Sequence, residues 1–344
     1  RMVAACRTLP GGQWFGGRSV PMGGLSGVVV RPEGRGRGLA RRLVADSLAA
    51  MVERGEAISM LYPTTASLYR ASGYEIAGDH GTWTVPVDAM PAPSTDGGGA
   101  EIRATEPDDD LDLRTLYDRM APALDGWLDR SERRWAQHRH SLVRADRAYQ
   151  YTGSIDGRPA WATRYHYRSR SDEAFDIEVD DLVATDLVAW RSALAFFAGH
   201  GTMARHLHLR LGPQLLTGVV DHPGALTRSD SMPWMLRLVD VAAAVAGRGY
   251  PAPISGTAML DIVDDVLPLN AGRWRLEVDH GVGHLERMPG QGGGVHCRID
   301  TLASIYTGWL HPAVAAARGQ LDGADGPTLA LLTAAFAGQP TCPD

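Results

Sequence analysis

The stretch VVVRPEGRGRGLARRL, residues 28–43, is the most informative part of this chain. A short β-branched run at residues 25–31 predicts a buried strand at its start. Apolar residues then recur at steps of three to five, as on one face of a helix; they are Leu39, Leu43, Val44, Leu48, Met51 and Val52. Gly55 is placed to end that helix, and residues 57–62 predict a second strand. Strand, glycine loop, helix and strand together indicate a βαβ unit.

The loop of this unit has the composition of a pyrophosphate-binding turn. It contains three glycines and two arginines: Gly34, Gly36, Gly38, Arg35 and Arg37. Glycines let backbone N–H groups approach a phosphate, and the helix that begins near Leu39 adds unpaired N–H groups and its positive dipole end. The arginines add positive charge. No Gly-Lys-Ser/Thr follows, and the dinucleotide-binding pattern is absent. The alternative is a turn between strand and helix that binds no ligand.

Composition excludes several classes of protein. The chain has 344 residues, 44% of them hydrophobic, which predicts two or three domains. The net charge is -6 and no basic-aromatic stripe occurs, so we expect no nucleic-acid partner. All 34 basic residues are arginine, which excludes a lysine nucleophile. No apolar run approaches the roughly 18 residues of a membrane span, and the first residues show no signal-peptide core.

The cysteines predict the compartment. Cys6, Cys297 and Cys342 are few and far apart. They match no zinc-binding spacing and no disulfide framework, so we expect no metal and a reducing, cytoplasmic location.

Later segments predict two further domains. Residues 85–100 are rich in Pro, Gly, Ser and Asp, which is typical of a linker. A second α/β unit follows; it comprises a strand at 101–105, helices at 108–122 and 129–144, strands at 148–154 and 158–167, and a helix at 187–200. An amphipathic helix is predicted over 231–250, and short alternating stretches then predict a small antiparallel sheet with closing helices. The fold class is α/β followed by α+β, with domains at 1–88, 101–228 and 231–344.

Two runs within residues 22–78, MGGLSGVVVRPEGRGRGLARRL and GEAISMLYPTTASLYRASGYEIAG, resemble a known family. They are similar to the GCN5-related N-acetyltransferases (GNATs), most closely the tandem-domain branch called Eis (enhanced intracellular survival). The resemblance implies two tandem GNAT-like domains, a sterol-carrier-like domain and a homo-oligomer. It also implies acyl-CoA as co-substrate, bound by Val28, Val29, Val30, Arg35, Gly36, Arg37, Gly38, Leu39 and Ala40. Family members have further elements before the acyl-CoA strand, so we expect part of the first domain to be missing here.

The family resemblance also assigns the general acid of the reaction. Tyr69 stands at the family position of the general acid, which returns a proton to the departing thiolate. The alternative is a buried tyrosine whose hydroxyl bonds to the backbone. Tyr74 is expected to pack in the core. Backbone N–H groups near Val28 and Val30 are expected to bind the thioester and the pantetheine arm where two strands diverge; the alternative is ordinary strand pairing.

The sequence does not assign the general base that removes a proton from the amine. The family uses the chain-terminal carboxylate, which Asp344 would supply. His200, His206 and His208 form a second candidate group, although they resemble partly exposed surface residues and no third metal ligand is evident. The acidic runs at 107–110, 180–181 and 264–265 are interpreted as solvated faces or caps, or as the approach for a cationic substrate.

Gly27 bears on the length of the acyl chain that the acyl-CoA donor carries. Eis-like proteins carry a bulky aromatic there, so glycine would open a channel for an acyl chain longer than acetyl; a β-bulge is the alternative. We therefore predict an N-acyltransferase acting on the primary amine of an amino-sugar antibiotic, such as a teicoplanin-type glycopeptide. One alternative is an acetyl-CoA-dependent enzyme acting on aminoglycosides, polyamines or lysine. Another is a non-catalytic lipid-binding or scaffold protein.

Overall fold

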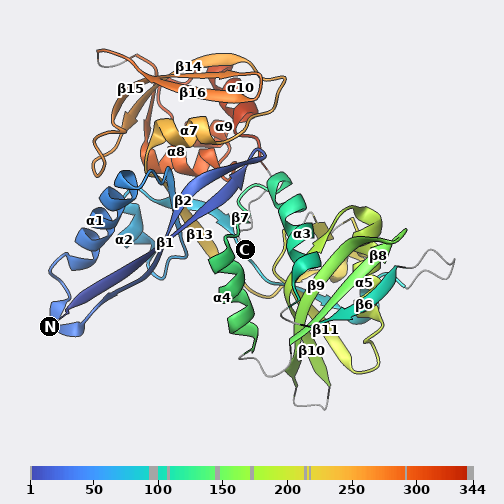
Figure 1. Ribbon diagram of the computed structural model, residues 1–344. Helices are drawn as coiled ribbons and strands as arrows, with labels where there is room; N and C mark the ends of the chain where they lie inside the picture. Colours follow the sequence, from blue (N-terminus) through green and yellow to red (C-terminus); the bar gives the residue numbers. More distant parts are fainter. Residues whose placement is uncertain are drawn as a thin grey trace. The chain divides into compact units, whose positions relative to one another are not determined.

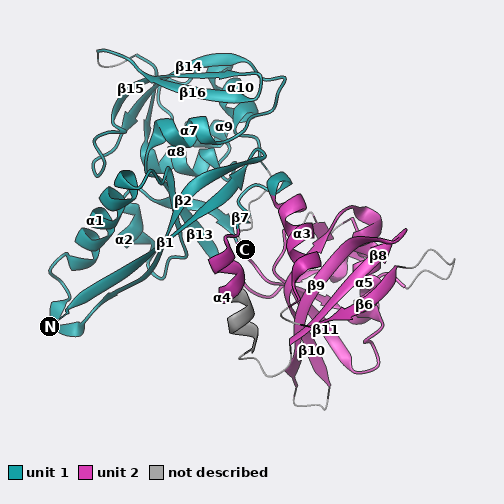
Figure 2. Ribbon diagram, viewed as in Figure 1, with its two compact units in different colours: residues 1–79, 122–129, 232–343 teal, residues 80–121, 130–231, 344 magenta. Residues whose placement is uncertain are grey.

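The computed structural model describes residues 2–92, 100–106, 109–143, 148–170, 174–212, 215–216, 218–290 and 293–338 (Figure 1). The described residues form two compact units (Figure 2). The first unit comprises residues within 1–79, 122–129 and 232–343, and the second comprises those within 80–121 and 130–231. No helix in the described ranges is long and apolar enough to cross a membrane.

The first unit contains a six-stranded sheet of order β4-β13-β3-β2-β1-β7. Its strands are β1 (Ala4–Phe15), β2 (Arg18–Val30), β3 (Ile58–Leu61), β4 (Glu75–Asp79), β7 (Leu128–Asp129) and β13 (Pro233–Leu238). β2 pairs with β1 in the antiparallel direction and with β3 in the parallel direction. α1 (Leu39–Glu53) connects β2 to β3, so the predicted βαβ unit is confirmed. Gly55 follows α1 at φ +73°, in the left-handed conformation expected after a helix.

β2 and β3 stay paired for a short distance only. Met22–Gly24 pair with Ile58–Met60, while β2 continues to Val30. Gly23 leaves room for side chains that pack on β2, since a Cβ there would lie 2.4 Å from the Glu56 carboxylate and 2.9 Å from Met51 of α1. The edge of β2 beyond Gly24 is therefore not paired with β3, and the two strands diverge beside α1.

The segment predicted as a helix over 231–250 is a strand followed by a shorter helix. β13 lies between β3 and β4 in the first sheet, and α7 (Val241–Gly247) follows it. Trp234, Leu236 and Leu238 are fully buried on one face, and Met235 and Val239 on the other. A strand enclosed on both faces has a continuous apolar sequence, which periodicity cannot distinguish from a buried helix.

The rest of the first unit is a four-stranded sheet with helices. Its strands are β14 (Gly256–Val263), β15 (Gly272–Asp279), β16 (Val282–Arg287) and β17 (Val295–Arg298), in the order β16-β15-β14-β17. The expected antiparallel sheet is confirmed except for β17, which pairs with β14 in the parallel direction. Its helices are α8 (Ile299–Tyr306), α9 (Pro312–Ala317) and α10 (Gly326–Ala335). α8 packs against β4 and β13, so this part shares a core with the first sheet.

The second unit is a seven-stranded sheet of order β12-β5-β11-β10-β9-β8-β6. Its strands are β5 (Trp83–Pro86), β6 (Glu101–Thr105), β8 (Ala148–Ile155), β9 (Arg158–Ser169), β10 (Phe175–Ala184), β11 (Ala204–Leu209) and β12 (Thr227–Arg228). Its helices are α3 (Leu111–Met120), α4 (Glu132–Val143) and α5 (Leu187–Ala198). The predicted strands at 101–105, 148–154 and 158–167 are confirmed. The linker predicted at 85–100 begins too early, because Val85 is fully buried within β5; residues 93–99 lie outside the described residues.

Candidate active site

The glycine loop opens the N-terminus of α1. After β2, a single 3-10 turn (Pro32–Gly34) leads to Gly36 and Gly38, at φ +74° and +71°. Gly38 is the N-cap of α1, and no side chain caps the helix there. The first turn of α1 also contains no acidic residue. The N-terminus of α1 thus lacks a side-chain cap, and a Cβ built on Gly36 or Gly38 meets no atom within 4 Å, which leaves the space that an anion site requires.

The residues assigned to the acyl-CoA site by resemblance lie on one continuous segment. Val29 is 59% exposed, while Val28 packs partly against the α1 side of the sheet. Arg35 and Arg37 are exposed, and Leu39 and Ala40 begin α1 half-buried. The segment therefore runs from the unpaired edge of β2 to the open end of α1 without interruption.

Gly27 lies in a β-bulge. The register between β1 and β2 shifts so that Cys6 stands opposite Gly27 and Val28, and Gly27 has φ +62°. The bulge interpretation of this glycine is therefore confirmed, and the backbone alone is a sufficient reason for it. A Cβ built on Gly27 meets no atom within 4 Å, so the space beside it is also open.

Tyr69 lies on α2 (Ala66–Arg70), in the same apolar cluster as Val28 and Leu25. Its side chain is 8% exposed, and its hydroxyl forms no hydrogen bond with any residue that the structure describes. The alternative of a backbone-bonded tyrosine is therefore not what the structure contains. Burial raises the pKa of Tyr69, so the phenol keeps its proton throughout the neutral range.

Tyr74 has the opposite environment. It is fully buried, and its hydroxyl lies 2.8 Å from Ser59 Oγ. Ser59 Oγ donates its one proton to the carbonyl of Gly23 at 2.7 Å, so Tyr74 must donate to Ser59. Burial raises the pKa of Tyr74 strongly, with the serine contact opposing it. The expectation that Tyr74 packs in the core is confirmed.

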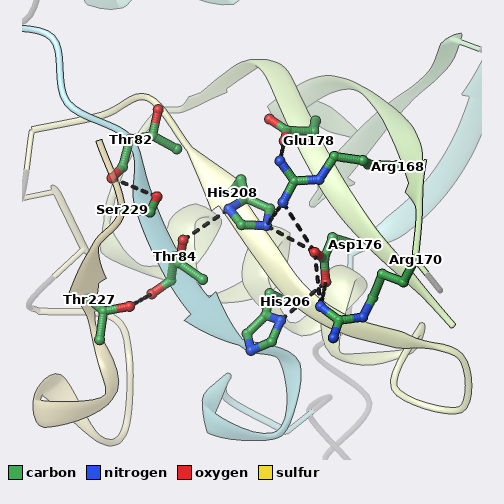
Figure 3. Close-up of polar contacts among 10 residues, drawn as sticks. All are labelled: Thr82, Thr84, Arg168, Arg170, Asp176, Glu178, His206, His208, Thr227 and Ser229. Atoms are coloured by element: carbon green, nitrogen blue, oxygen red, sulfur yellow. Dashed lines mark hydrogen bonds and ion pairs between the residues drawn. The ribbon is translucent and has the colours of Figure 1, made fainter. Parts of the chain in front are cut away.

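The three candidate histidines belong to the second unit. Figure 3 shows His206 and His208 on β11 beside Asp176 of β10. His206 Nδ1 lies 3.1 Å from Asp176 Oδ1. His208 Nε2 lies 2.8 Å from Arg168 Nη2 and 3.4 Å from Asp176 Oδ2, and His208 Nδ1 lies 2.9 Å from Thr84 Oγ1.

His200 is not grouped with the other two. Its Nε2 lies 3.2 Å from the Tyr165 hydroxyl, within a cluster of aromatic rings, and burial lowers its pKa. His206 and His208 contact residues of their own sheet, and His200 also contacts the Phe196 carbonyl of α5 at 3.2 Å. Within the described ranges, no His, Cys, Asp and Glu side chains group as metal ligands. Asp344, the family's expected base, lies outside the described residues.

Asp176 is the centre of a charged network. Arg168 and Arg170 contact its carboxylate at 3.2 and 3.3 Å. Burial favours its neutral form, but hydrogen bonds with Arg168, His206 and His208 and the charge of Arg170 lower its pKa to about 2. The carboxylate is therefore a fixed negative charge, neutralised by its neighbours.

The acidic pairs at 180–181 and 264–265 are divided between surface and interior. Asp181 accepts from Arg130 at 2.7 Å and Asp264 from Arg237 at 2.6 Å, with all four side chains buried. The interpretation as solvated faces is wrong for these two carboxylates, since each compensates a buried arginine. Asp265 is exposed. Of the run at 107–110, residues 107 and 108 lie outside the described residues.

Known proteins match the whole chain. Residues 1–77 and 126–238 each match an Acetyltransferase (GNAT) domain, and residues 241–343 match a Sterol carrier protein domain. An uncharacterized N-acetyltransferase of Streptomyces avermitilis is 28% identical, over 100% of this chain and 86% of its own. The N-acetyltransferase Eis of Mycobacterium tuberculosis is 26% identical, over 92% of this chain and 78% of its own. The chain belongs to the Eis-like family of tandem GNAT N-acetyltransferases.

A solved structure agrees with the Eis-like assignment. A GCN5-related N-acetyltransferase from Anabaena variabilis has a TM-score of 0.89 at 28% identity, covering 98% of this chain and 84% of that one. This Eis-like chain is therefore an enzyme, an acyl-CoA-dependent transferase, with tandem GNAT domains and a C-terminal sterol-carrier-like domain.

Sequence reasoning missed part of the Eis-like site. Ser59, which holds Tyr74, and Arg237, which lies beneath the turn after Tyr69, had no assigned role. One signal for Arg237 is present in WMLRLV, residues 234–239, where a single arginine interrupts an apolar run. Such an arginine is buried with a partner, and Asp264 is that partner.

Proposed function

We propose that the enzyme transfers an acyl group from acyl-CoA to a primary amine within the N-terminal GNAT domain. One observation carries this: β2, whose edge leaves β3, α1, whose N-terminus is open, and Tyr69, whose hydroxyl is unbonded among the described residues, all contribute to one apolar cluster. The loop residues Arg35–Ala40 would hold the pyrophosphate, and Val28, Val29 and Val30 would hold the pantetheine arm and the thioester. Acyl-CoA supplies the activated acyl group.

Acyl transfer forms one bond, breaks another and moves two protons. The amine nitrogen bonds to the thioester carbonyl carbon as the carbon–sulfur bond breaks. Backbone N–H groups at the β2 edge would stabilise the charge on the carbonyl oxygen. Tyr69 would give its proton to the departing sulfur. The ammonium loses its extra proton to a base, which the family resemblance assigns to the chain-terminal carboxylate; this assignment stays a prediction.

Two substrate classes remain in competition. The open space beside Gly27 favours a medium or long acyl chain and, with it, an amino-sugar antibiotic such as a teicoplanin-type glycopeptide as acceptor. The relative named N-acetyltransferase Eis favours an acetyl group as the group transferred. The acceptors in this alternative are aminoglycosides, polyamines or lysine, as the family resemblance implies. Gly27 is weaker evidence for a long acyl donor than the sequence suggested, because the β-bulge already requires a glycine at φ +62°. We propose the longer-chain donor first, since it makes the sharper prediction.

A thiol-release assay separates the two classes. Acetyl-, octanoyl- and decanoyl-CoA are each offered with a panel of aminoglycosides, a glycopeptide pseudoaglycone, a polyamine and a lysine peptide. Release with a long acyl donor and the glycopeptide supports the first proposal. Release with acetyl-CoA across many aminoglycosides, and none with octanoyl- or decanoyl-CoA, contradicts it and supports the Eis-like alternative.

The scaffold alternative requires a site that binds no acyl-CoA. The open helix end and the retained Tyr69 speak against it. Calorimetry with acyl-CoA tests this directly, since a non-catalytic scaffold would show no binding. The homo-oligomer, the cytoplasmic location and the boundaries at 1–88, 101–228 and 231–344 stay predictions.

A further inference from the structure

A buried ion pair joins the first sheet to the segment after β14. Arg237 on β13 is fully buried, and its Nη2 donates to Asp264 Oδ2 at 2.6 Å. Asn270 Nδ2 donates to the same oxygen at 2.9 Å. Asp264 Oδ1 accepts the backbone N–H groups of Val266 and Leu267 at 3.0 Å each. Both carboxylate oxygens are thus engaged, and Asp264 holds Arg237 in one position.

Arg237 lies against the turn between α2 and β4. A Cβ on Gly73 would lie 2.9 Å from both Cζ and Nε of Arg237, closer than real Cβ contacts occur. Glycine therefore allows the guanidinium to pack on the backbone of the turn. Strand alternation places Arg237 on the same face of β13 as Met235 and Val239, which pack in the cluster that contains Tyr69.

The turn that rests on Arg237 begins at Tyr69. The Tyr69 carbonyl accepts the N–H groups of Ser72 at 2.8 Å and Tyr74 at 3.2 Å. Gly73, between those two donors, has φ +81°. Ile299 closes the other side, with its Cγ2 3.0 Å from a Cβ on Gly73. The turn is therefore confined, and a displacement of the guanidinium would be transmitted to the Tyr69 backbone.

We propose that Arg237 and Asp264 are a positioning pair that holds Tyr69 in place for acyl transfer. Asp264 belongs to the segment that matches the sterol carrier domain, so that segment would contribute to catalysis by fixing the position of Tyr69. The proposal rests on the proposed role of Tyr69 as proton donor. Misplacement of a donor by about 1 Å can cost up to about 100-fold in rate, so a small shift is enough.

Asp264→Asn tests the pair. The substitution keeps the shape but turns an N–H group toward either Arg237 or the backbone donors. We expect kcat to fall about tenfold, while the Kd for acyl-CoA changes less than about twofold. Asp181→Asn is the matched control, because the Arg130–Asp181 pair of the second unit is equally buried at 2.7 Å. An equal loss of kcat in both variants at equal Tm would overturn the proposal.

A double-mutant cycle with Tyr69→Phe separates positioning from general structure. If the pair acts through Tyr69, adding Asp264→Asn to Tyr69→Phe lowers kcat no further. Suppose that Tyr69→Phe strongly lowers kcat, and that Asp264→Asn lowers kcat by the same factor in the Tyr69→Phe variant as in the wild type. The pair is then structural, and only this proposal fails. Full activity of Tyr69→Phe itself would remove the proposed role of Tyr69, and this proposal with it. If Asp264→Asn does not fold, Arg237→Lys, which keeps the positive charge but loses the planar fork, is measured in the same cycle.

Discussion

The rings of Tyr69 and Tyr74 lie 6.1 Å apart at an interplanar angle of 71°, yet of their two hydroxyls only that of Tyr74 has a hydrogen-bond partner among the described residues. The two phenols share an apolar cluster on one face of the first sheet. The Tyr74 side chain is fully buried and bonded to Ser59, whereas the Tyr69 hydroxyl forms no hydrogen bond with any described residue. These environments indicate a structural role for Tyr74 and favour the proposed chemical role for Tyr69.

We predict that Tyr69→Phe lowers kcat by about 100-fold or more, the usual contribution of a general acid. The Kd for acyl-CoA should change little, because the phenol acts at the leaving sulfur and not at the phosphates. Steady-state kinetics combined with calorimetry measure both quantities. An equal loss in kcat and in acyl-CoA affinity would show that Tyr69 is structural.

Tyr74→Phe is the matched control for that variant. It removes the hydrogen bond to Ser59 and should lower the free energy of unfolding by about 1 kcal/mol, with kcat nearly unchanged. Chemical denaturation and the same kinetic assay check it. A larger kcat loss in Tyr74→Phe than in Tyr69→Phe would reverse the assignment of the two tyrosines.

The part of the fold that local chemistry determines was predictable from the sequence. The end of β2 at Val30, the helix face from Leu39 to Val52 and the stop at Gly55 follow from periodicity and glycine positions. These signals are short-range, so they need no knowledge of distant segments. The predicted strand at 25–31 is the last part of the longer β2, and the expectation that it is buried is wrong, since Val29 is 59% exposed. The open N-terminus of α1 was also predictable, because the two glycines that determine it, Gly36 and Gly38, lie close together just before the helix.

Long-range pairing was not predictable. β13 enters the first sheet from more than 150 residues after β4, and its burial on both faces removed the alternation that marks a strand. β1 contains Pro10, Gly11 and Gly12, which argue against a strand. The structure tolerates Pro10 because β7 pairs with β1 only at Gly12 and Gln13, which leaves Pro10 at an open edge. The buried pair of Arg237 and Asp264 depends on the same long-range topology.

Two glycines at opposite ends of α1 test the phosphate-binding loop. Gly38 and Gly55 have φ of +71° and +73°, and a Cβ on either meets no atom within 4 Å. An aspartate therefore causes similar backbone strain at both positions, about 1–2 kcal/mol. Only Gly38→Asp places a carboxylate where the phosphates are expected. We predict that Gly38→Asp nearly abolishes acyl-CoA binding in calorimetry and that Gly55→Asp leaves it within about threefold. Unchanged affinity in Gly38→Asp would make the loop assignment wrong.

The space beside Gly27 tests the length of the acyl donor. Gly27→Ala and Gly27→Phe share the strain of φ +62°, and only phenylalanine adds bulk. If this space holds a long acyl chain, Gly27→Phe should lower the ratio of kcat/KM for octanoyl-CoA to that for acetyl-CoA by about tenfold relative to Gly27→Ala, a loss of about 1.4 kcal/mol of selectivity. The same ratio in both variants would show that Gly27 serves the bulge alone.

Asp176 predicts an acid-dependent contribution to stability in the second unit. Its pKa of about 2 lies below the value of 3.8 expected for an unfolded chain. A carboxylate with a lowered pKa stabilises the folded state fully above its unfolded pKa, and this contribution decreases as the pH falls from about 4 toward 2. Asp176→Asn should therefore be less stable than the wild type at about pH 5, and the difference should shrink as the pH falls below about 4. Urea denaturation at each pH measures this difference. A difference that instead increases below pH 4 would show that Asp176 is not held ionised by Arg168 and His206.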